Sequence, residues 1–232
     1  MDYRAVSLDE LLGPLNEVER RNAPKSLLIA GDTRILEVGA RVSIAGAREA
    51  SPEGIRRAAK LAGLLSGNGI VVVSGLEGGI ETAAHEAAVR HGGRSIVVLG
   101  PSLDRFDPRQ NEGLHPKVAE DHLVVSLYPP GRPIPKKDLS LRDRTLALIS
   151  DATVIIEASD SSGCLDQGWE ALRLGRPLLI ADSMVEESGL SWPEQMLHYG
   201  ARILSDDSLD EFQELLPAGM AAHVDRGIIA DL

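Results

Sequence analysis

Cysteine is almost absent from this chain, and its scarcity excludes several kinds of site. Among 232 residues the one cysteine, Cys164, has no partner for an intrachain disulfide and no cysteine cluster for a metal. The six histidines do not fall at metal-ligand spacings such as HExxH. We therefore expect no metal site and no bound cofactor. A chain with a single cysteine also fits a reducing, cytoplasmic compartment.

Long apolar runs and strongly aromatic stretches are missing too. No run approaches the roughly 18–20 apolar residues that a membrane span requires. The first ten residues, MDYRAVSLDE, lack the basic-then-apolar order of a signal peptide. We therefore expect no membrane association. Aromatic residues make up only 3% of the chain, which offers little for base stacking.

Positive charge is also in short supply, with a formal net charge of −11, but its distribution is uneven. From Asp182 onward there are eleven acidic residues and two basic ones. Residues 132–144 instead carry five basic residues and two acidic ones. Because the acidity is concentrated in the tail, an anionic ligand for the rest of the chain remains compatible with the composition.

The chain does contain short runs rich in valine, isoleucine and leucine, each followed by a segment of helical pattern. The expected strands are 42–45, 70–74, 95–100, 123–127, 153–158 and 177–182, with a further short strand in SLLIAGD and another in ARILS. The expected helices are LDELLGPLNEVERR and about 52–66, 79–91, 110–121, 141–150, 164–174, 191–199 and 208–216. This alternation predicts an α/β fold with a doubly wound, mostly parallel sheet covered by helices on both faces.

The same pattern predicts the organisation of the chain. Residues 1–40 form a lead-in of helix and strand, residues 41–183 form the core, and residues 184–232 form an acidic C-terminal extension packed on that core. In open α/β sheets ligands bind where strands end and helices begin. The loops that follow the predicted strands are therefore the expected ligand-binding positions.

The first such loop, GAREAS, follows strand 42–45. Gly46 permits a tight turn, Arg48 supplies a cation for a phosphate, and Ser51-Pro52 is a typical helix start. An ordinary strand-to-helix turn would have the same sequence features. The loop does not match GxGxxG, so a dinucleotide fingerprint is absent.

The second loop follows strand 70–74 and is rich in glycine. Ser74, Gly75, Gly78 and Gly79 together favour a loop whose backbone N–H groups approach an anion. The alternative is that the glycines permit tight packing of the helix on the sheet.

The third loop, after strand 153–158, is rich in serine, aspartate and glycine. Ser161, Ser162 and the amides of Gly163 and Cys164 are expected to form another anion-binding helix start, although a plain capped helix would look similar. Nothing in the sequence activates Cys164 as a nucleophile.

A basic connection precedes the predicted helix 141–150. We expect it to border the phosphate-binding loops, although a solvated loop would look the same. Its candidate phosphate-binding residues are Lys136, Lys137, Arg142 and Arg144. The sequence has no GxxxxGK[ST], no GxSxG and no clear carboxylate pair, so ATP hydrolysis, acyl transfer and glycosidase chemistry have no positive support.

Taken in order, these motifs resemble the DNA-processing protein A family (DprA/Smf) of bacteria. The resemblance covers about residues 23–183 and is carried by LLIAGD, VSIAGAR, VVVSGLEGGIETAAHEAAVRHGGRSIVVLG, LDRFDPRQNEGL, LYPPGRPIP, LRDR and SGCLDQGWEALRLGRPLLIAD. It implies an extended Rossmann-like fold, single-stranded DNA binding, a homodimer, and loading of a RecA-type recombinase during transformation.

The resemblance also implies roles for individual residues. Arg48 matches the arginine that holds DNA phosphate, while Arg142 and Arg144 match the two arginines of the family's Arg-Asn-Arg run. Lys136 and Lys137 fall near the family's basic pocket. The loop 75–79 departs from the family in carrying an acid, Glu77, in place of an arginine. On this basis we expect a DNA-binding protein and not an enzyme.

A second resemblance, to the lysine-decarboxylase-like LOG proteins, supplies the alternatives. Those proteins hydrolyse nucleoside monophosphates with an arginine and a catalytic glutamate. Here Gln167 stands where that glutamate belongs, and an amide cannot transfer a proton or carry the stabilising charge. A small-nucleotide sensor in stress or phage defence is therefore the first alternative, and a nucleotide N-glycosidase the second.

Overall fold

The computed structural model describes residues 3–100, 122–129, 139–187, 189–205 and 216. The strands of this part are β1 Arg4–Val6, β2 Leu27–Gly31, β3 Arg41–Ala45, β4 Val71–Ser74, β5 Ser95–Leu99, β6 Leu123–Ser126, β7 Ala152–Ile155, β8 Leu178–Ala181 and β9 Arg202–Leu204. The helices are α1 Leu8–Leu12, α2 Glu17–Asn22, the 3₁₀ helix η1 Thr33–Glu37, α3 Pro52–Gly67, α4 Ile80–Arg90, α6 Leu139–Ile149, α7 Cys164–Arg173, α8 Asp182–Glu186 and α9 Trp192–His198.

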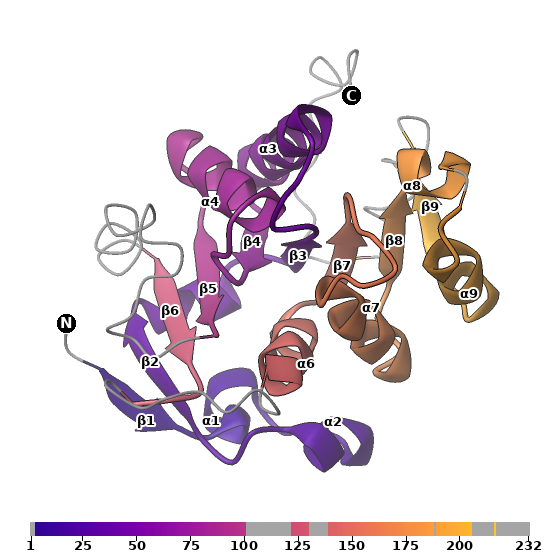
Figure 1. The fold of residues 1–232 in the computed structure, drawn as a ribbon. Coiled ribbons are helices and arrows are strands. Elements are labelled where there is room, and N and C mark those ends of the chain that lie inside the picture. The colour runs from indigo at the N-terminus through magenta and orange to yellow at the C-terminus, as the bar shows by residue number, and fades with distance from the viewer. Residues whose placement is uncertain (1–2, 101–121, 130–138, 188, 206–215, 217–232) are drawn as a thin grey trace.

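All nine strands belong to one sheet, whose order is β1-β2-β6-β5-β4-β3-β7-β8-β9. The seven strands from β6 to β9 in this order run parallel, and β2 pairs antiparallel with both β1 and β6. The prediction of a doubly wound, mostly parallel α/β sheet is therefore confirmed (Figure 1). The chain runs from β3 outward to β6 and then returns to the other side of β3 with β7, so the strand order reverses between β3 and β7.

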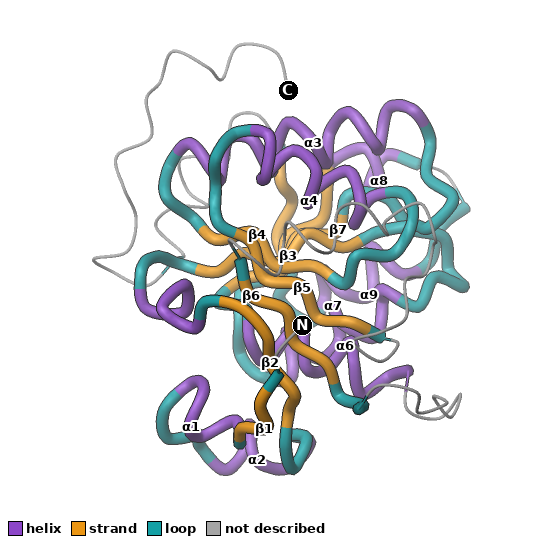
Figure 2. The backbone as a smooth tube through the Cα atoms, turned by 90° about the vertical axis from the view of Figure 1, so that its left-hand side faces the viewer, coloured by secondary structure: helices purple, strands orange, loops and turns teal. Residues whose placement is uncertain are grey.

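Helices cover both faces of the sheet, as Figure 2 shows. Helices α3 and α4 pack on one face against buried side chains such as Ile44, Val72 and Val154. Helix α6 packs on the other face against β4, β5 and β6, and α7 and α9 pack there against β7 and β8. The strand core is almost wholly aliphatic, which explains why continuous valine, isoleucine and leucine runs predicted its strands.

The N-terminal segment differs from its predicted single helix. Helix α1 ends at Leu12 because Gly13 adopts φ +84 and Pro14 cannot continue the helix. Asn16 then starts α2 with a capping box to Glu19. Strand β1 was not predicted, and together with β2 it extends the sheet at one edge.

Most of the remaining predicted elements agree with the structure within the described residues, but the predicted strand 153–158 ends at Ile155, and η1 and α8 were not predicted. Strand 177–182 is shorter than expected because α8 begins at Asp182. The predicted helices 110–121 and 208–216 lie outside the described residues. The boundaries at residues 40 and 183 stay predictions, although β1, β2 and β9 share the sheet of the central segment. No helix in the described part combines the length and apolarity that crossing a bilayer demands.

Candidate functional site

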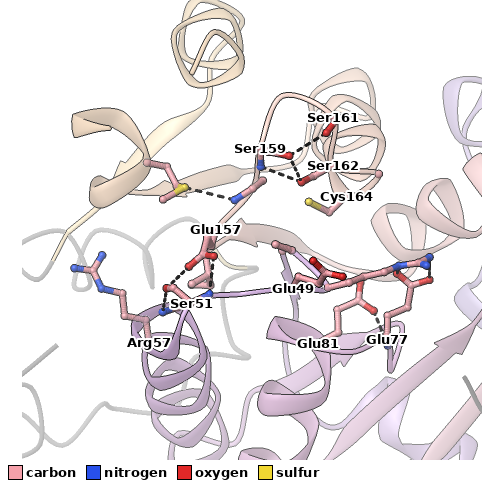
Figure 3. Close-up of a pocket in the computed structure, with 18 of the residues that line it drawn as sticks. Glu49, Ser51, Arg57, Glu77, Glu81, Glu157, Ser159, Ser161, Ser162 and Cys164 are labelled. Carbon is pink, nitrogen blue, oxygen red and sulfur yellow. Dashed lines mark hydrogen bonds and ion pairs between the residues drawn. The ribbon is translucent and has the colours of Figure 1, made fainter. Parts of the chain in front are cut away.

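A cavity of about 790 Å³ lies at the carboxyl ends of β3, β4 and β7, where the strand order reverses. This is the position at which open α/β sheets bind their ligands. Its walls come from the loop after β3, the loop and helix start after β4, the loop after β7, the first turns of α6 and the segment after β8. Figure 3 shows Ser159, Ser161 and Ser162 on one wall and Glu77 and Glu81 on another.

Glycine lets the loops after β3, β4 and β7 meet closely. A Cβ at Gly46 would lie 2.6 Å from Cγ1 of Ile80, and a Cβ at Gly79, where φ is +72, would lie 2.3 Å from the carbonyl oxygen of Ala47. Ala47 also donates its N–H to the carbonyl oxygen of Glu157 at 2.7 Å. Contacts within the protein therefore leave no room for a side chain at either glycine, and for Gly79 this agrees with the packing interpretation of its loop.

The loop after β4 holds its conformation through a buried side chain. Leu76 adopts φ +59, an unfavourable value for a residue with a side chain, and its side chain packs with Val97, Leu99 and Val124. The next residue, Glu77, donates its N–H to Oε2 of Glu81 at 2.9 Å. The backbone of Glu77 is thus fixed between a hydrophobic anchor and the start of α4.

Arg48 projects from the loop after β3 and is paired with Glu77. Nε of Arg48 donates to Oε2 of Glu77 at 2.7 Å, and its Nη2 contacts Oε1 of the same carboxylate. The Arg48 side chain is 63% exposed, whereas that of Glu77 is 19% exposed. The pair therefore lies at the mouth of the cavity, with the arginine outermost.

Arg142, from α6, is deeply buried and bound to two carboxylates. Its Nη2 lies 2.9 Å from both oxygens of Glu81, and its Nη1 lies 2.6 Å from Oε1 of Glu77. Burial acts to lower the pKa of Arg142, but the charges of Glu81, Glu77 and Asp143 outweigh it and raise that pKa. Burial also raises the pKa of Glu81, against the attraction of Arg142. Glu77 thus bridges Arg48 and Arg142, two of the three arginines that the sequence predicted to contact phosphate.

Asp143 adds a further carboxyl to the same cavity. Burial raises the pKa of Asp143 to about 7, with Arg142 opposing that shift and Glu81 and Glu77 adding to it. A substantial fraction of this carboxyl is consequently protonated near neutral pH, when it can donate a hydrogen bond.

The serine-rich loop between β7 and α7 forms a different wall of the cavity from the one that carries Glu77 and Glu81. The N–H of Ser159 donates to Oγ of Ser162 at 2.9 Å, and the Oγ atoms of Ser159 and Ser161 lie 3.1 Å apart. The loop leads to Gly163, the N-cap of α7. No side-chain hydrogen bond from this N-cap position caps the N-terminus of the helix. Ser161, Ser162 and Gly163 therefore present hydroxyls and a helix N-terminus to the cavity, an arrangement suited to an anion.

Carboxylates outnumber arginines in the described lining of this cavity. The acidic residues are Glu49, Glu53, Glu77, Glu81, Asp143, Glu157 and Glu187, and the basic ones are Arg48, Arg57 and Arg142. Each of the three arginines contacts a carboxylate of the protein. The carboxylate of Glu157 likewise accepts the N–H and Oγ–H of Ser51 at 2.8 and 2.6 Å, at the start of α3. An anionic ligand must therefore compete with the protein's own acids.

The structure gives the other sequence candidates different surroundings. Ser74 is buried and donates its hydroxyl to the carbonyl oxygen of Ile44 at 2.7 Å. Gly78 is half-buried in the loop after β4, and Arg144 is half-buried in α6 without lining the cavity. Lys136 and Lys137 lie outside the described residues. A ligand contact by any of these residues stays a prediction.

The surroundings of Cys164 and Gln167, the two residues considered for catalysis, do not favour a catalytic role for either. Burial raises the pKa of Cys164 to about 12, which keeps it a thiol. Gln167 is buried and does not line the cavity, and its Nε2 donates to Oγ of Ser43 at 2.6 Å. It therefore serves a core hydrogen bond between α7 and β3.

Sequence reasoning missed the roles of Glu81, Asp143 and Glu157. Glu81 and Asp143 lie in helices, and an isolated acidic residue in a helical segment is usually interpreted as exposed to solvent. Their one signal was proximity to motifs already singled out, since Glu81 follows the glycine loop and Asp143 adjoins Arg142.

Comparison with known proteins gives a consistent result over most of the chain. Residues 10–215 match the family model described as DNA recombination-mediator protein A. DNA processing protein DprA of Streptococcus pneumoniae is 32% identical over 202 residues, which are 86% of this chain and 71% of that protein. DprA of Bacillus subtilis is 26% identical over 193 residues, 82% of this chain and 65% of that protein.

Solved structures with the same fold include two DprA proteins. The structure of S. pneumoniae DprA superposes with a TM-score of 0.76 at 30% identity, covering 90% of this chain and 74% of that one. A Helicobacter pylori DNA processing protein A, whose structure was solved to study its single-stranded DNA binding mode, gives 0.77 at 24% identity, covering 93% and 97%. A molybdenum cofactor binding protein from Rippkaea orientalis shares the fold alone, at 0.56 and 16% identity, covering 76% and 96%.

Proposed function

This chain belongs to the DNA recombination-mediator protein A family, the DprA/Smf proteins, and from that premise we propose that it binds single-stranded DNA in DNA processing, recombination or transformation. The relatives carry the name DNA processing protein, and the H. pylori structure concerns single-stranded DNA binding. A ligand with a phosphate backbone suits a sheet-end cavity bordered by an arginine, serine hydroxyls and a helix N-terminus.

The observation that carries this proposal is the position of Arg48. It is the most exposed of the three cavity arginines, with 63% of its side chain accessible, and it stands at the point where the strand order reverses. Arg48 would contact a backbone phosphate, and Ser161, Ser162 and Gly163 would receive a neighbouring one. Arg142, with 5% of its side chain accessible, would position this site from within through Glu77.

Further proposed contacts and partners follow from the family. Lys136, Lys137 and Arg144 would extend the basic path along the DNA backbone. A homodimer would double the phosphate contacts available to one strand, and a RecA-type recombinase would receive that strand. We place this activity in the cytoplasm, where such a substrate occurs.

We also propose that binding proceeds without chemistry on the nucleotide. The position of the LOG-type catalytic glutamate is occupied by Gln167, whose amide is engaged by Ser43 in the core. Neither the amide of Gln167 nor the hydroxyl of Ser43 can donate or accept a proton in the way that glycosidic cleavage requires.

The deciding experiment is a titration of labelled oligo-dT and of a panel of mononucleotides at one salt concentration. We expect oligo-dT to bind more tightly than any mononucleotide, and Arg48→Ala to weaken that binding. Arg56→Ala is the matched control, since Arg56 is similarly exposed, on α3, and does not line the cavity. Equal weakening by both substitutions, or no oligonucleotide binding at all, would refute the proposal.

One observation favours a second candidate, a small-nucleotide sensor. A cavity of about 790 Å³ lies in the size range of sites for compact ligands, whereas a strand of DNA needs only a groove. In the same titration, a mononucleotide that binds more tightly than oligo-dT would select this candidate.

A further inference from the structure

We propose that Glu77 is an internal competitor for the phosphate-binding guanidinium of Arg48 and so sets the affinity of this site. The inference rests on the proposed function, because it concerns the same phosphate contact. In the structure the Glu77 carboxylate takes both Nε and Nη2 of Arg48, which is the fork that a phosphate would use.

The geometry makes Glu77 a built-in occupant of this position. Its backbone is held by the N–H bond to Glu81 and by Thr82, whose N–H donates to the carbonyl oxygen of Glu77 at 3.0 Å. The buried side chain of Leu76 fixes the preceding residue. The backbone that carries the carboxylate is thus fixed by contacts that do not involve Arg48.

Arg142 lets Glu77 release Arg48 at small cost. Nη1 of Arg142 lies 2.6 Å from Oε1 of Glu77, and that contact is buried. When Arg48 turns toward a phosphate, Glu77 keeps its contact with Arg142, a cation that it shares with Glu81. The Arg48 side of the bridge is exposed, and exposed ion pairs contribute little. Exchange of Arg48 between Glu77 and a ligand is therefore feasible without rearranging the core.

Competition of this kind has a measurable electrostatic signature. The ions released on binding are cations condensed on the DNA phosphates. A guanidinium whose charge is balanced by a neighbouring carboxylate neutralises a phosphate less fully, so its contact releases fewer of these cations. Each phosphate contact to a single strand adds about 0.7 to the slope of log K against log salt. Freeing Arg48 from Glu77 should recover up to that amount.

The test is Glu77→Gln, measured by titration of labelled oligo-dT at several salt concentrations with the full chain. We expect binding to tighten by up to about fivefold, as loss of an exposed ion pair would allow, and the salt slope to steepen by up to about 0.7. Glu77→Asp keeps the charge beside Arg142 and shortens its reach toward Arg48, so a smaller gain is expected. Thermal unfolding establishes that each variant is folded, and either variant suffices if the other is not.

Two controls separate competition for Arg48 from a general loss of negative charge. In the Arg48→Ala background, Glu77→Gln should give no gain, because the guanidinium in dispute is absent. Glu187→Gln removes a charge from the wall of the same cavity, at a residue that is not paired with a cavity arginine, and should tighten binding less. An equal gain in either control would overturn the inference.

The remaining outcomes distinguish this inference from the proposed function. Binding by the native chain that Glu77→Gln leaves unchanged would overturn the competitor role and leave DNA binding intact. Binding that emerges only in Glu77→Gln would support the competitor role. Absence of binding in both proteins would refute the proposed function, and the competitor role with it.

Discussion

The guanidinium of Arg142 lies directly over Gly75, so that a Cβ at position 75 would come within 1.9 Å of Nη2 and 2.5 Å of Cζ. The glycine that the sequence offered as a phosphate contact therefore makes room for a buried arginine. Because Arg142 is also bound to Glu81 and Glu77, its guanidinium has little freedom to move aside. The loop after β4, the start of α4 and the start of α6 are locked together at this point.

Gly75→Ala should lower the free energy of unfolding by about 1–3 kcal/mol, because the added methyl group displaces a guanidinium that is held by ion pairs. Chemical denaturation measures this. Gly67→Ala is the matched control, since a Cβ there meets nothing within 4 Å and φ is not positive. A Gly75→Ala variant as stable as Gly67→Ala would show that Arg142 can relocate freely.

Arg142→Met should destabilise the fold by about 3–5 kcal/mol, because it leaves Glu81 as an unpaired buried acid. Adding Glu81→Gln to this variant should restore part of the loss, since the uncompensated charge is then gone. Arg48→Ala, at an exposed pair, should cost no more than about 1 kcal/mol. Denaturation compares these three variants with Glu81→Gln alone and with the native chain, and additive effects of Arg142→Met and Glu81→Gln would contradict the buried pair.

Much of this fold could be predicted because the chain's local and global signals agree. Strands such as Val71–Ser74 and Leu178–Ala181 are buried on both faces, and only continuous aliphatic runs satisfy that environment. The antiparallel pairing of β2 with β6 could not be predicted, since it joins segments about a hundred residues apart whose local patterns do not encode direction.

The sequence predicted where the candidate site lies, but it did not predict which side chains of the site form ion pairs with one another. Loops after parallel strands must gather at one edge of the sheet, so Arg48 and the glycine loop were expected to be close. That Glu77 holds Arg48 depends on the rotation of each side chain within those loops, which the sequence does not specify. Gln167 lies at a helix start and Ser74 at a strand end, in motifs that suggest a ligand, yet both side chains make hydrogen bonds in the core. The sequence does not specify the direction of these side chains either.

The buried His85 should make the fold lose stability in mild acid. Burial lowers the pKa of His85 from 6.5 to about 4, with His122 acting in the same direction. Between these values the unfolded chain binds a proton that the folded chain does not. The contribution of His85 is therefore complete above pH 6.5 and is lost as the pH falls toward 4.

We expect His85 to account for about 2–3 kcal/mol of the loss between pH 7 and pH 4.5. Urea denaturation of His85→Gln at both values should show a correspondingly smaller loss. His91→Gln, at the exposed end of α4, is the control and should follow the native chain. The idea fails if His85→Gln follows the native pH dependence as well.

Asp143 should act in the opposite sense over an overlapping pH range. Its pKa is raised from 3.8 to about 7, chiefly by burial, so the folded state holds the extra proton between these values. Its contribution is complete below pH 3.8 and is lost as the pH rises through 7. Asp143→Asn should therefore gain stability relative to the native chain between pH 5 and pH 8. Asp166→Asn, exposed on α7, should not, and denaturation at several pH values compares them.

Replacing Gln167 tests whether this cavity lacks only one carboxylate to become a hydrolase. Gln167 and Ser43 are both buried, and Nε2 of Gln167 donates to Oγ of Ser43 at 2.6 Å. Gln167→Glu removes that donor and places an acid in the core, so we expect a loss of about 1–3 kcal/mol and no release of base from nucleoside monophosphates. Chromatography for free adenine or cytosine, alongside denaturation, measures both effects. Base release by the native chain that disappears in Arg142→Lys would contradict the binding-only proposal. Release that arises only in Gln167→Glu would instead mean that residue 167 can turn from the core into the cavity.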